Sequence, residues 1–251
     1  MPDFAPLSTA KRLLTGGSAQ PAAAGRFELR RLLGRGAQAS VWLAHDPRLQ
    51  REVAIKLLPP VQGQDAAAVL EQWLREARHV GRLAHPHIVP VFEADVQGQQ
   101  PYIVFEYVPG CTLAEHLERQ GRCAPHDAVS LVVDVLDGLQ AAHAAGIVHR
   151  DIKPGNVMVD AGGRLRLLDF GIAKILNPAS FDQTIDQTLP SVRLMTPAYA
   201  SPEQVRGETV EAPSDIFSLG SMLVEMITGK RPFVGKTAAE TMAAILRDDP
   251  P

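Results

Sequence analysis

Two short segments of the chain carry residue types that could transfer a phosphoryl group. Residues 149–156 read HRDIKPGN and residues 169–171 read DFG. They supply the carboxylates of Asp151 and Asp169, the ammonium of Lys153 and the amide of Asn156. Carboxylate and amide oxygens can hold Mg²⁺, and an ammonium can neutralise charge on a phosphoryl group. The segments therefore predict a site that holds Mg²⁺ and a triphosphate and orients a hydroxyl for attack.

Two motifs nearer the N-terminus could complete such a site. Gly34 and Gly36 lie between two predicted strands, and glycine lets backbone amides approach phosphate oxygens. A Gly-x-Gly pair alone is often just a turn, and a Rossmann site is disfavoured because a strand follows it. Lys56 ends the run VAIK at residues 53–56, where a lysine by itself would usually face solvent.

In this order the motifs resemble those of protein kinases, specifically bacterial serine/threonine kinases of the eukaryotic-like type. The resemblance covers about residues 26–249 and includes the SPE run at residues 201–203. It implies an α+β fold of two lobes: a small antiparallel sheet with one main helix, and a larger, mainly helical lobe. It also implies ATP and Mg²⁺ as cofactors, with Mn²⁺ as an alternative metal, and proteins bearing serine or threonine as substrates.

The resemblance gives roles to the residues of the two segments. Asp151 would orient the attacking hydroxyl, and Lys153 would neutralise the transferred group and mark serine/threonine specificity. Asn156 and Asp169 would bind the metal. Asp215 would hold the backbone of the catalytic loop.

Lys56 would contact the α- and β-phosphates and be held by a glutamate from the helix of the small lobe. Glu76 is the candidate, since it lies mid-helix between apolar positions, and Glu71 is the alternative. Gly34 and Gly36 would lie over the phosphates, with Ala39 in place of the usual third glycine. The residues expected around the adenine ring are Leu33, Val41 and Ala54 above, Met158 below, Phe105 at the back, and the backbone of Glu106 and Val108 at the base edge.

The segment between Asp169 and Glu203 is expected to carry regulation. Arg150 would pair with a phosphate there, and the predicted autophosphorylation sites are Thr188 first and Thr184 second. Thr196 would contact the catalytic aspartate and lysine, although Met195 replaces the glycine usual before it. Phosphorylation between copies would involve self-association.

Residue patterns predict the elements that position these groups. Strand-like runs occupy residues 27–33, 40–44, 52–58, 89–92 and 102–107, and apolar spacing predicts a helix over 69–83. Two Thr-x-x-Glu runs, at 112–115 and 237–240, predict capping boxes. Short strands are expected at 157–159 and 165–168, and a helix from about Asp215 to Thr228. A further helix should bury one face, formed by Val129, Val132, Val133, Leu136, Leu139 and His143.

These elements predict three parts of the chain. Residues 1–25 read as a flexible tether, and residues 26–251 as the kinase domain. Its small lobe should run from about 26 to 107 and its large lobe from about 108 to 251. The resemblance implies about two more helices after Pro251, including an arginine partner for Glu203, so the last helices are expected to be missing.

Composition excludes several other classes. The formal net charge of −3 argues against a general nucleic-acid binder. Cys111 and Cys123 are too few for a disulfide scaffold. No apolar run approaches the roughly 18 residues that cross a bilayer, and no signal peptide is evident. A cytoplasmic chain without a membrane segment is therefore expected, with an anchor beyond residue 251 left open.

Two other functions compete with an active protein kinase. A pseudokinase used as a scaffold or binding module would typically lack one of Lys56, Asp151, Asn156 and Asp169, all of which are present. A small-molecule phosphotransferase would share the Asp-x-x-x-x-Asn loop but lack an activation segment that ends in SPE.

Overall fold

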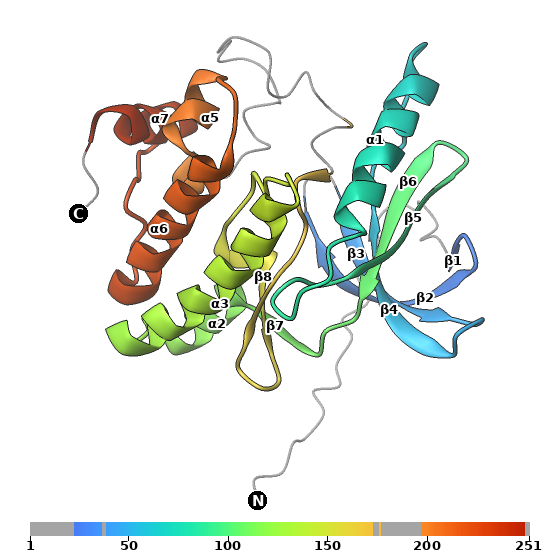
Figure 1. Cartoon of the computed structure of the whole chain (residues 1–251), viewed down its shortest axis with the longest axis horizontal. Helices are drawn as coiled ribbons and strands as arrows, with labels where there is room; N and C mark the ends of the chain where they lie inside the picture. Colours follow the sequence, from blue (N-terminus) through green and yellow to red (C-terminus); the bar gives the residue numbers. More distant parts are fainter. Residues whose placement is uncertain (1–22, 37–38, 173–175, 177–196, 249–251) are drawn as a thin grey trace, which may run out of the picture.

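The computed structural model of the chain describes residues 23–36, 39–172, 176 and 197–248. Six strands of this part form an antiparallel sheet in the order β1-β2-β3-β4-β6-β5 (Figure 1). A second antiparallel sheet has the order β7-β8-β9. The strands are β1 (Ala23–Ala24), β2 (Phe27–Arg35), β3 (Ser40–Asp46), β4 (Arg51–Leu57), β5 (Val91–Gln97), β6 (Gln100–Glu106), β7 (Gly110–Thr112), β8 (Val157–Asp160) and β9 (Leu165–Leu167).

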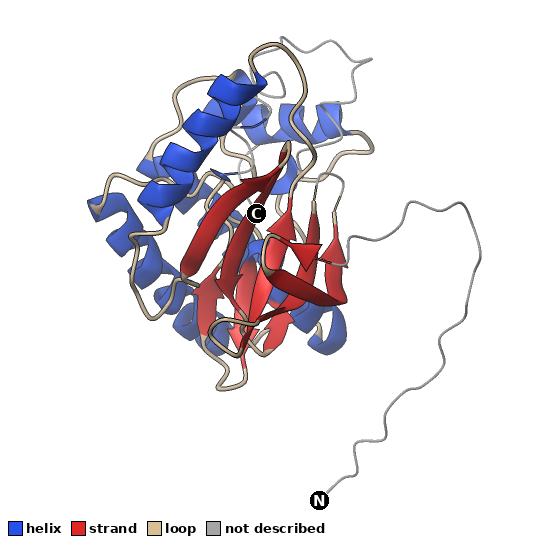
Figure 2. Ribbon diagram, turned by 90° about the vertical axis from the view of Figure 1, so that its right-hand side faces the viewer, coloured by secondary structure: helices blue, strands red, loops and turns tan. Residues whose placement is uncertain are grey.

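One helix accompanies the larger sheet, two helices lie against the smaller one, and the remaining helices pack beyond these two. The helices are α1 (Ala66–Val80), α2 (Leu113–Gln120), α3 (Pro125–Ala144), α5 (Pro202–Arg206), α6 (Ala212–Thr228) and α7 (Ala238–Arg247), with 3-10 turns at η1 (Pro154–Asn156) and η4 (Pro197–Tyr199). Helix α1 lies beside β5 and β6, whereas α2 and α3 lie beside β7 and β8 (Figures 1 and 2). This arrangement is the two-lobed α+β fold that the resemblance implied.

The larger sheet has one face with an apolar cluster and an opposite face that carries Lys56. Side chains alternate along a strand, so Val53, Ile55 and Leu57 of β4 pack on one side, in a cluster with Phe27 and Trp42. Ala54 and Lys56 lie on the opposite side. That side joins the main core, which includes Phe105, Trp73 of α1 and Leu139 of α3. The pleat of β4 thus directs the lysine between the sheet and the rest of the molecule.

Most of the predicted elements are confirmed with shifted ends. The strand predicted at 89–92 is β5, which begins at Val91, and the helix predicted at 69–83 is α1, which ends at Val80. The predicted helix from Asp215 begins at Ala212 and ends at Thr228. Gly229 follows it in the left-handed conformation at φ 72°, as is common after a helix. Ala23 and Ala24, which the predicted tether of residues 1–25 included, pair with β2, and Ala24 is buried. Residues 1–22 lie outside the described part of the chain.

The buried face predicted for α3 is partly wrong. Val132 and Leu139 are buried, but Val129, Val133 and Leu136 are 51%, 55% and 40% exposed. The helix instead buries small residues, including Ala128, Gly138 and Ala142. A Cβ on Gly138 would come within 3.1 Å of the His87 carbonyl and of Leu167. Helix α3 packs so closely against His87 and Leu167 that only small side chains fit there, whereas the prediction was based on large apolar side chains.

The capping box at the start of α2 is confirmed. The hydroxyl of Thr112 accepts a hydrogen bond from the amide of Glu115 (3.2 Å), and the Glu115 carboxylate accepts one from the Thr112 amide (2.9 Å). The box predicted at Thr237 is only half formed. Thr237 accepts from the Glu240 amide, but the Glu240 carboxylate accepts from Lys236 instead of from Thr237.

Replacing Thr112 with alanine is expected to lower the free energy of unfolding by about 1 kcal/mol, because the Glu115 amide at the start of α2 loses its hydrogen-bond acceptor. Urea unfolding would measure the change. Glu118→Ala, at an exposed position of the same helix, serves as the control and should stay within about 0.5 kcal/mol of wild type. Equal stabilities of Thr112→Ala and wild type would contradict the role of the cap.

Candidate active site

Asp215 of α6 holds the start of the loop at residues 149–156 through hydrogen bonds to its backbone. Its side chain is buried, and it accepts hydrogen bonds from the backbone amides of His149 and Arg150, both at 2.8 Å. The Nε2 of His143 also donates to it, at 2.8 Å. One carboxylate therefore satisfies three donors from α3 and the loop, which confirms the predicted contact with the loop backbone.

The imidazole of His149 joins this loop to the strand before Asp169. Its Nε2 donates to the carbonyl of Leu168 (2.8 Å), and its Nδ1 accepts from the amide of Asp151 (3.3 Å). A ring that donates at one nitrogen and accepts at the other is neutral. Burial lowers the pKa of His149, in agreement with that form. The positions of Asp151 and Asp169 are thus coupled through one buried ring.

Asp151, Lys153 and Asn156 meet as the sequence predicted. Lys153 Nζ lies 2.8 Å from Asp151 Oδ2. Asn156 Nδ2 donates to the same carboxylate oxygen (2.7 Å) and to the Asp151 backbone carbonyl (2.8 Å). These contacts fix the direction of the Asp151 carboxylate. Because the amide nitrogen of Asn156 is directed at Asp151, its amide oxygen is the atom suited to a metal.

Asp169 lies in an unusual turn next to this group. It has a left-handed backbone at φ 62°, and the Gly171 amide donates to its carbonyl at 2.7 Å. Gly171 itself has φ 37°, and a Cβ there would come within 3.0 Å of the His149 carbonyl. Glycine is needed at 171 because the turn passes so close to the catalytic loop. This close packing brings the Asp169 carboxylate beside the loop.

The two oxygens of Asp169 have different surroundings. Oδ2 forms an ion pair with Lys56 of β4, and the side chains of the lysine and the aspartate are 12% and 22% exposed. Oδ1 is buried and has no hydrogen-bond partner among the described residues. A buried anionic oxygen without a donor is costly unless something positive occupies the adjoining space. This oxygen therefore fits a bound divalent cation.

The predicted contact between Lys56 and Glu76 is not formed. Glu76 is exposed on α1, and the alternative, Glu71, pairs with Arg75 at 2.9 Å. Within the described ranges, the carboxylate paired with Lys56 is that of Asp169. The ammonium of Lys56 pairs with the carboxylate of Asp169 because that carboxylate lies next to it, while the side chain of Glu76 faces solvent.

The residues predicted around adenine lie on strands of both sheets and on the connection between them. Val41 is opposite Lys56 in the β3–β4 ladder, and Ala54 is opposite Phe105 in the β4–β6 ladder. These pairs place Val41, Ala54 and Phe105 on the same face of the larger sheet as the lysine. The remaining predicted residues have these places: Leu33 and Gly34 lie near the end of β2 and Gly36 just after it, Glu106 ends β6, Val108 lies in the connection to β7, and Met158 lies on β8.

Contacts after the activation segment include residues that the sequence analysis missed. Thr184, Thr188 and Thr196 lie outside the described residues. Ser201 caps α5 by accepting from the Gln204 amide (3.3 Å), and Gln204 Nε2 donates to the carbonyl of Arg150 (2.9 Å). The Ser-x-x-Gln spacing is a capping-box signal that could have identified Gln204. Glu203 accepts a hydrogen bond from Ser214, directly before Asp215.

Residues 27–249 match the family model of the protein kinase domain, so the chain belongs to the protein kinase domain family. The chain is 41% identical over 229 residues to serine/threonine-protein kinase PknB of Mycolicibacterium smegmatis, an alignment that covers 90% of this chain and 36% of the relative. It is 39% identical over 230 residues to a probable serine/threonine-protein kinase of Streptomyces coelicolor, covering 90% and 33%. The chain thus spans about a third of the length of these curated relatives.

Among the described helices, none has both the length and the apolar character needed to cross a bilayer.

Proposed function

We propose that this chain transfers the γ-phosphoryl group of Mg–ATP to serine or threonine hydroxyls of proteins. The observation that carries the proposal is the meeting of two groups distant in sequence. Asp151, Lys153 and Asn156 are joined by hydrogen bonds, and Asp169 lies beside them in an ion pair with Lys56. The printed names of the relatives describe serine/threonine-protein kinases, in agreement with this assignment.

The charge and position of each residue at the site suggest its role in phosphoryl transfer. Asp151 accepts a hydrogen bond from the substrate hydroxyl and aligns it, while Lys153 neutralises charge on the transferred group. Lys56 binds the α- and β-phosphates, and its ammonium lies in an ion pair with Asp169. Asn156 and Asp169 would hold Mg²⁺, which supplies charge neutralisation across the phosphate oxygens. Phosphoryl transfer needs alignment and electrostatic stabilisation, and these residues provide both.

Regulation by autophosphorylation extends the proposal. Thr188 and then Thr184 are the proposed acceptors, Arg150 the proposed partner of the phosphate, and Thr196 a proposed contact of the catalytic residues. Transfer between two copies would involve transient self-association. Phosphopeptide mass spectrometry of active protein should find phosphate within residues 180–196, and a modification-free segment in active protein would refute this part.

Labelled ATP tests the central proposal. With Mg²⁺ and a generic basic protein, the wild-type chain should place label on serine or threonine, and chelation of the metal should abolish it. Asp151→Asn should reduce transfer by about 10²-fold, since the hydroxyl loses its anionic acceptor. Equal labelling by the two forms would indicate a contaminating kinase and refute the assignment. Nucleotide binding without transfer would instead support the scaffold alternative.

A further inference from the structure

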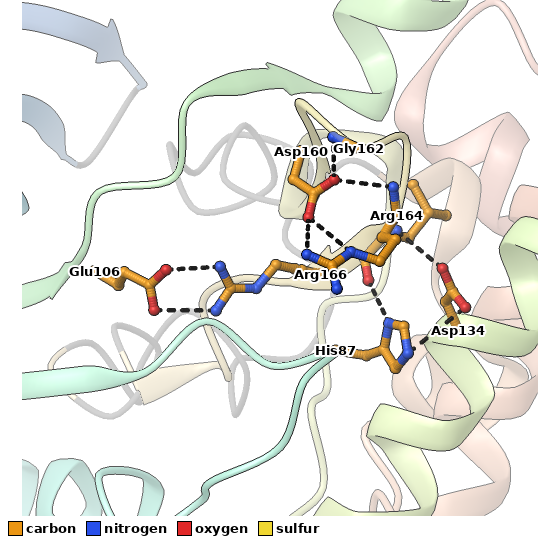
Figure 3. A network of polar contacts seen from close by, with 8 residues as sticks. His87, Glu106, Asp134, Asp160, Gly162, Arg164 and Arg166 are labelled. Carbon is orange, nitrogen blue, oxygen red and sulfur yellow. Dashed lines mark hydrogen bonds and ion pairs between the residues drawn. The ribbon is translucent and has the colours of Figure 1, made fainter.

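An ion pair between Glu106 and Arg166 joins the two sheets (Figure 3). Arg166 Nη1 donates to Glu106 Oε1 at 2.8 Å, and Nη2 donates to Oε2 at 3.1 Å. Glu106 is the last residue of β6, and Arg166 is the middle residue of β9. The pair therefore spans the place where the chain leaves the larger sheet for the smaller one.

Both partners lie next to predicted walls of the adenine site: Glu106 is on the same strand as Phe105, and Arg166 is on the strand paired with that of Met158. In the β8–β9 ladder, Arg166 is opposite Met158, the residue proposed below the ring. Glu106 directly follows Phe105, which is opposite Ala54, one of the residues proposed above the ring. The amide of Glu106 also donates to the Pro90 carbonyl at 3.0 Å. The ion pair thus connects β6, at the edge of the adenine site, to β9, which is paired with the strand of Met158.

The pair has the features of a strong contact. Two parallel bonds between a guanidinium and a carboxylate are charge-assisted and directional. The Arg166 side chain is 15% exposed and that of Glu106 37%, so solvent screens the pair only partly. The hydrogen bonds from Arg166 lower the pKa of Glu106, and the same contact raises the pKa of Arg166. The Nε of Arg166 is buried without a partner among the described residues, so the contact depends on its two terminal nitrogens.

Strand β9 is held on its other side by Asp134 of α3 and by His87. The Leu165 amide donates to Asp134 of α3 (3.1 Å), and His87 Nδ1 donates to the Leu165 carbonyl (2.9 Å; Figure 3). Arg166 therefore projects toward Glu106 from a strand that is itself fixed. A change in the separation of Glu106 and Met158 must stretch or break the ion pair.

We propose that the Glu106–Arg166 ion pair sets the spacing of the adenine site and that Arg166 is a positioning residue for ATP. The inference rests on the proposed function, because it assumes that ATP binds at the junction of the sheets. Arg166→Met keeps an unbranched apolar stem but removes the guanidinium and with it the pair. It should weaken the binding of ATP and of adenosine by a common factor of about ten. Binding of magnesium tripolyphosphate, which has no base, should be unchanged.

Calorimetric or competition Kd values for these three probes test the idea. The variants are Arg166→Met, Glu106→Gln and the two combined, with Arg164→Met as the matched control. Arg164 lies two residues away and pairs with Asp160 of the same hairpin, and it is 69% exposed. The combined variant should bind adenosine no more weakly than Arg166→Met, since both changes remove one interaction. In kinetics, the KM for ATP should rise more than kcat falls, and Arg164→Met should match wild type.

Three results would overturn the inference. The first is unchanged adenosine binding by Arg166→Met, and the second is an equal loss of tripolyphosphate affinity in that variant. The third is a loss of adenosine affinity that occurs in Arg164→Met as well and follows the melting temperature of each variant. If Arg166→Met does not fold, Glu106→Gln and the reversed pair Glu106→Arg/Arg166→Glu give the same test. The reversed pair should recover part of the adenosine affinity that Glu106→Gln loses, and no recovery would count against the proposal. A wild-type chain that binds no ATP would refute the proposed function instead.

Discussion

Replacing Asp169 with asparagine is expected to reduce phosphoryl transfer by about 10³-fold or more while the chain remains folded. The substitution keeps the shape of the side chain and removes its charge. The Oδ1 of Asp169 is buried without a hydrogen-bond partner in the described structure, and its Oδ2 pairs with Lys56. A metal ligand that loses its charge forfeits several kcal/mol of charge stabilisation, and each 1.4 kcal/mol corresponds to a factor of ten in rate.

The measurement is kcat at saturating ATP over a titration of Mg²⁺. The half-saturating concentration of Mg²⁺ should rise for Asp169→Asn, and circular dichroism should show an intact fold. Lys56→Met tests the coupling, because Lys56 is the ion-pair partner of Asp169. Added to Asp169→Asn, it should reduce the rate less than it does alone, since residues that act as a unit are not additive. Activity of Asp169→Asn within tenfold of wild type would rule out its role as a metal ligand.

Replacing Asp215 with alanine is expected to lower the free energy of unfolding by about 3–5 kcal/mol. The buried carboxylate accepts from the amides of His149 and Arg150 and from the ring of His143. Alanine leaves these donors without an acceptor in a place that water does not reach, at about 1–3 kcal/mol for each unsatisfied group. Where the Asp215→Ala chain stays folded, it should also transfer phosphate about 10²-fold more slowly, because the loop at residues 149–156 is no longer held in place.

Asp127→Ala is the matched control for this substitution. Both aspartates lie in the first turn of a helix, so both interact with the helix dipole. Asp127 is exposed, however, and its substitution should lower stability by less than about 1 kcal/mol. Thermal and urea unfolding of the two variants distinguish the stability that comes from the buried hydrogen bonds of Asp215 from the stability that comes from the helix dipole. Similar losses of stability in both would show that the three hydrogen bonds of Asp215 contribute little.

Local patterns in the sequence were sufficient for much of this molecule. The capping box at Thr112 and the glycine after α6 were predicted correctly because their partners lie within a few residues. The alternation of Val53, Ala54, Ile55 and Lys56 predicted both the strand and a lysine on one of its faces. The loop at residues 149–156 brought Asp151, Lys153 and Asn156 together for the same reason, since they are separated by at most five residues.

Contacts between distant residues could not be predicted in this way. Lys56 pairs with Asp169, 113 residues away, rather than with a glutamate of α1. Helical spacing favours certain side chains but does not fix how a helix is rotated about its axis relative to a sheet. The buried face of α3 was misjudged because close packing against β9 and residue 87 requires small side chains, which carry little weight in a hydrophobic pattern.

The sequence by itself determined which chemical groups the site contains and the order in which they occur, because the types and short spacings of residues persist whatever the tertiary arrangement. Tertiary structure decided which of these groups meet: Lys56 with Asp169, Asp215 with the loop at 149–156, and Glu106 with Arg166. Each of these contacts depends on burial and on the relative placement of elements far apart in the chain. Those quantities arise only when the two sheets and their helices pack against one another.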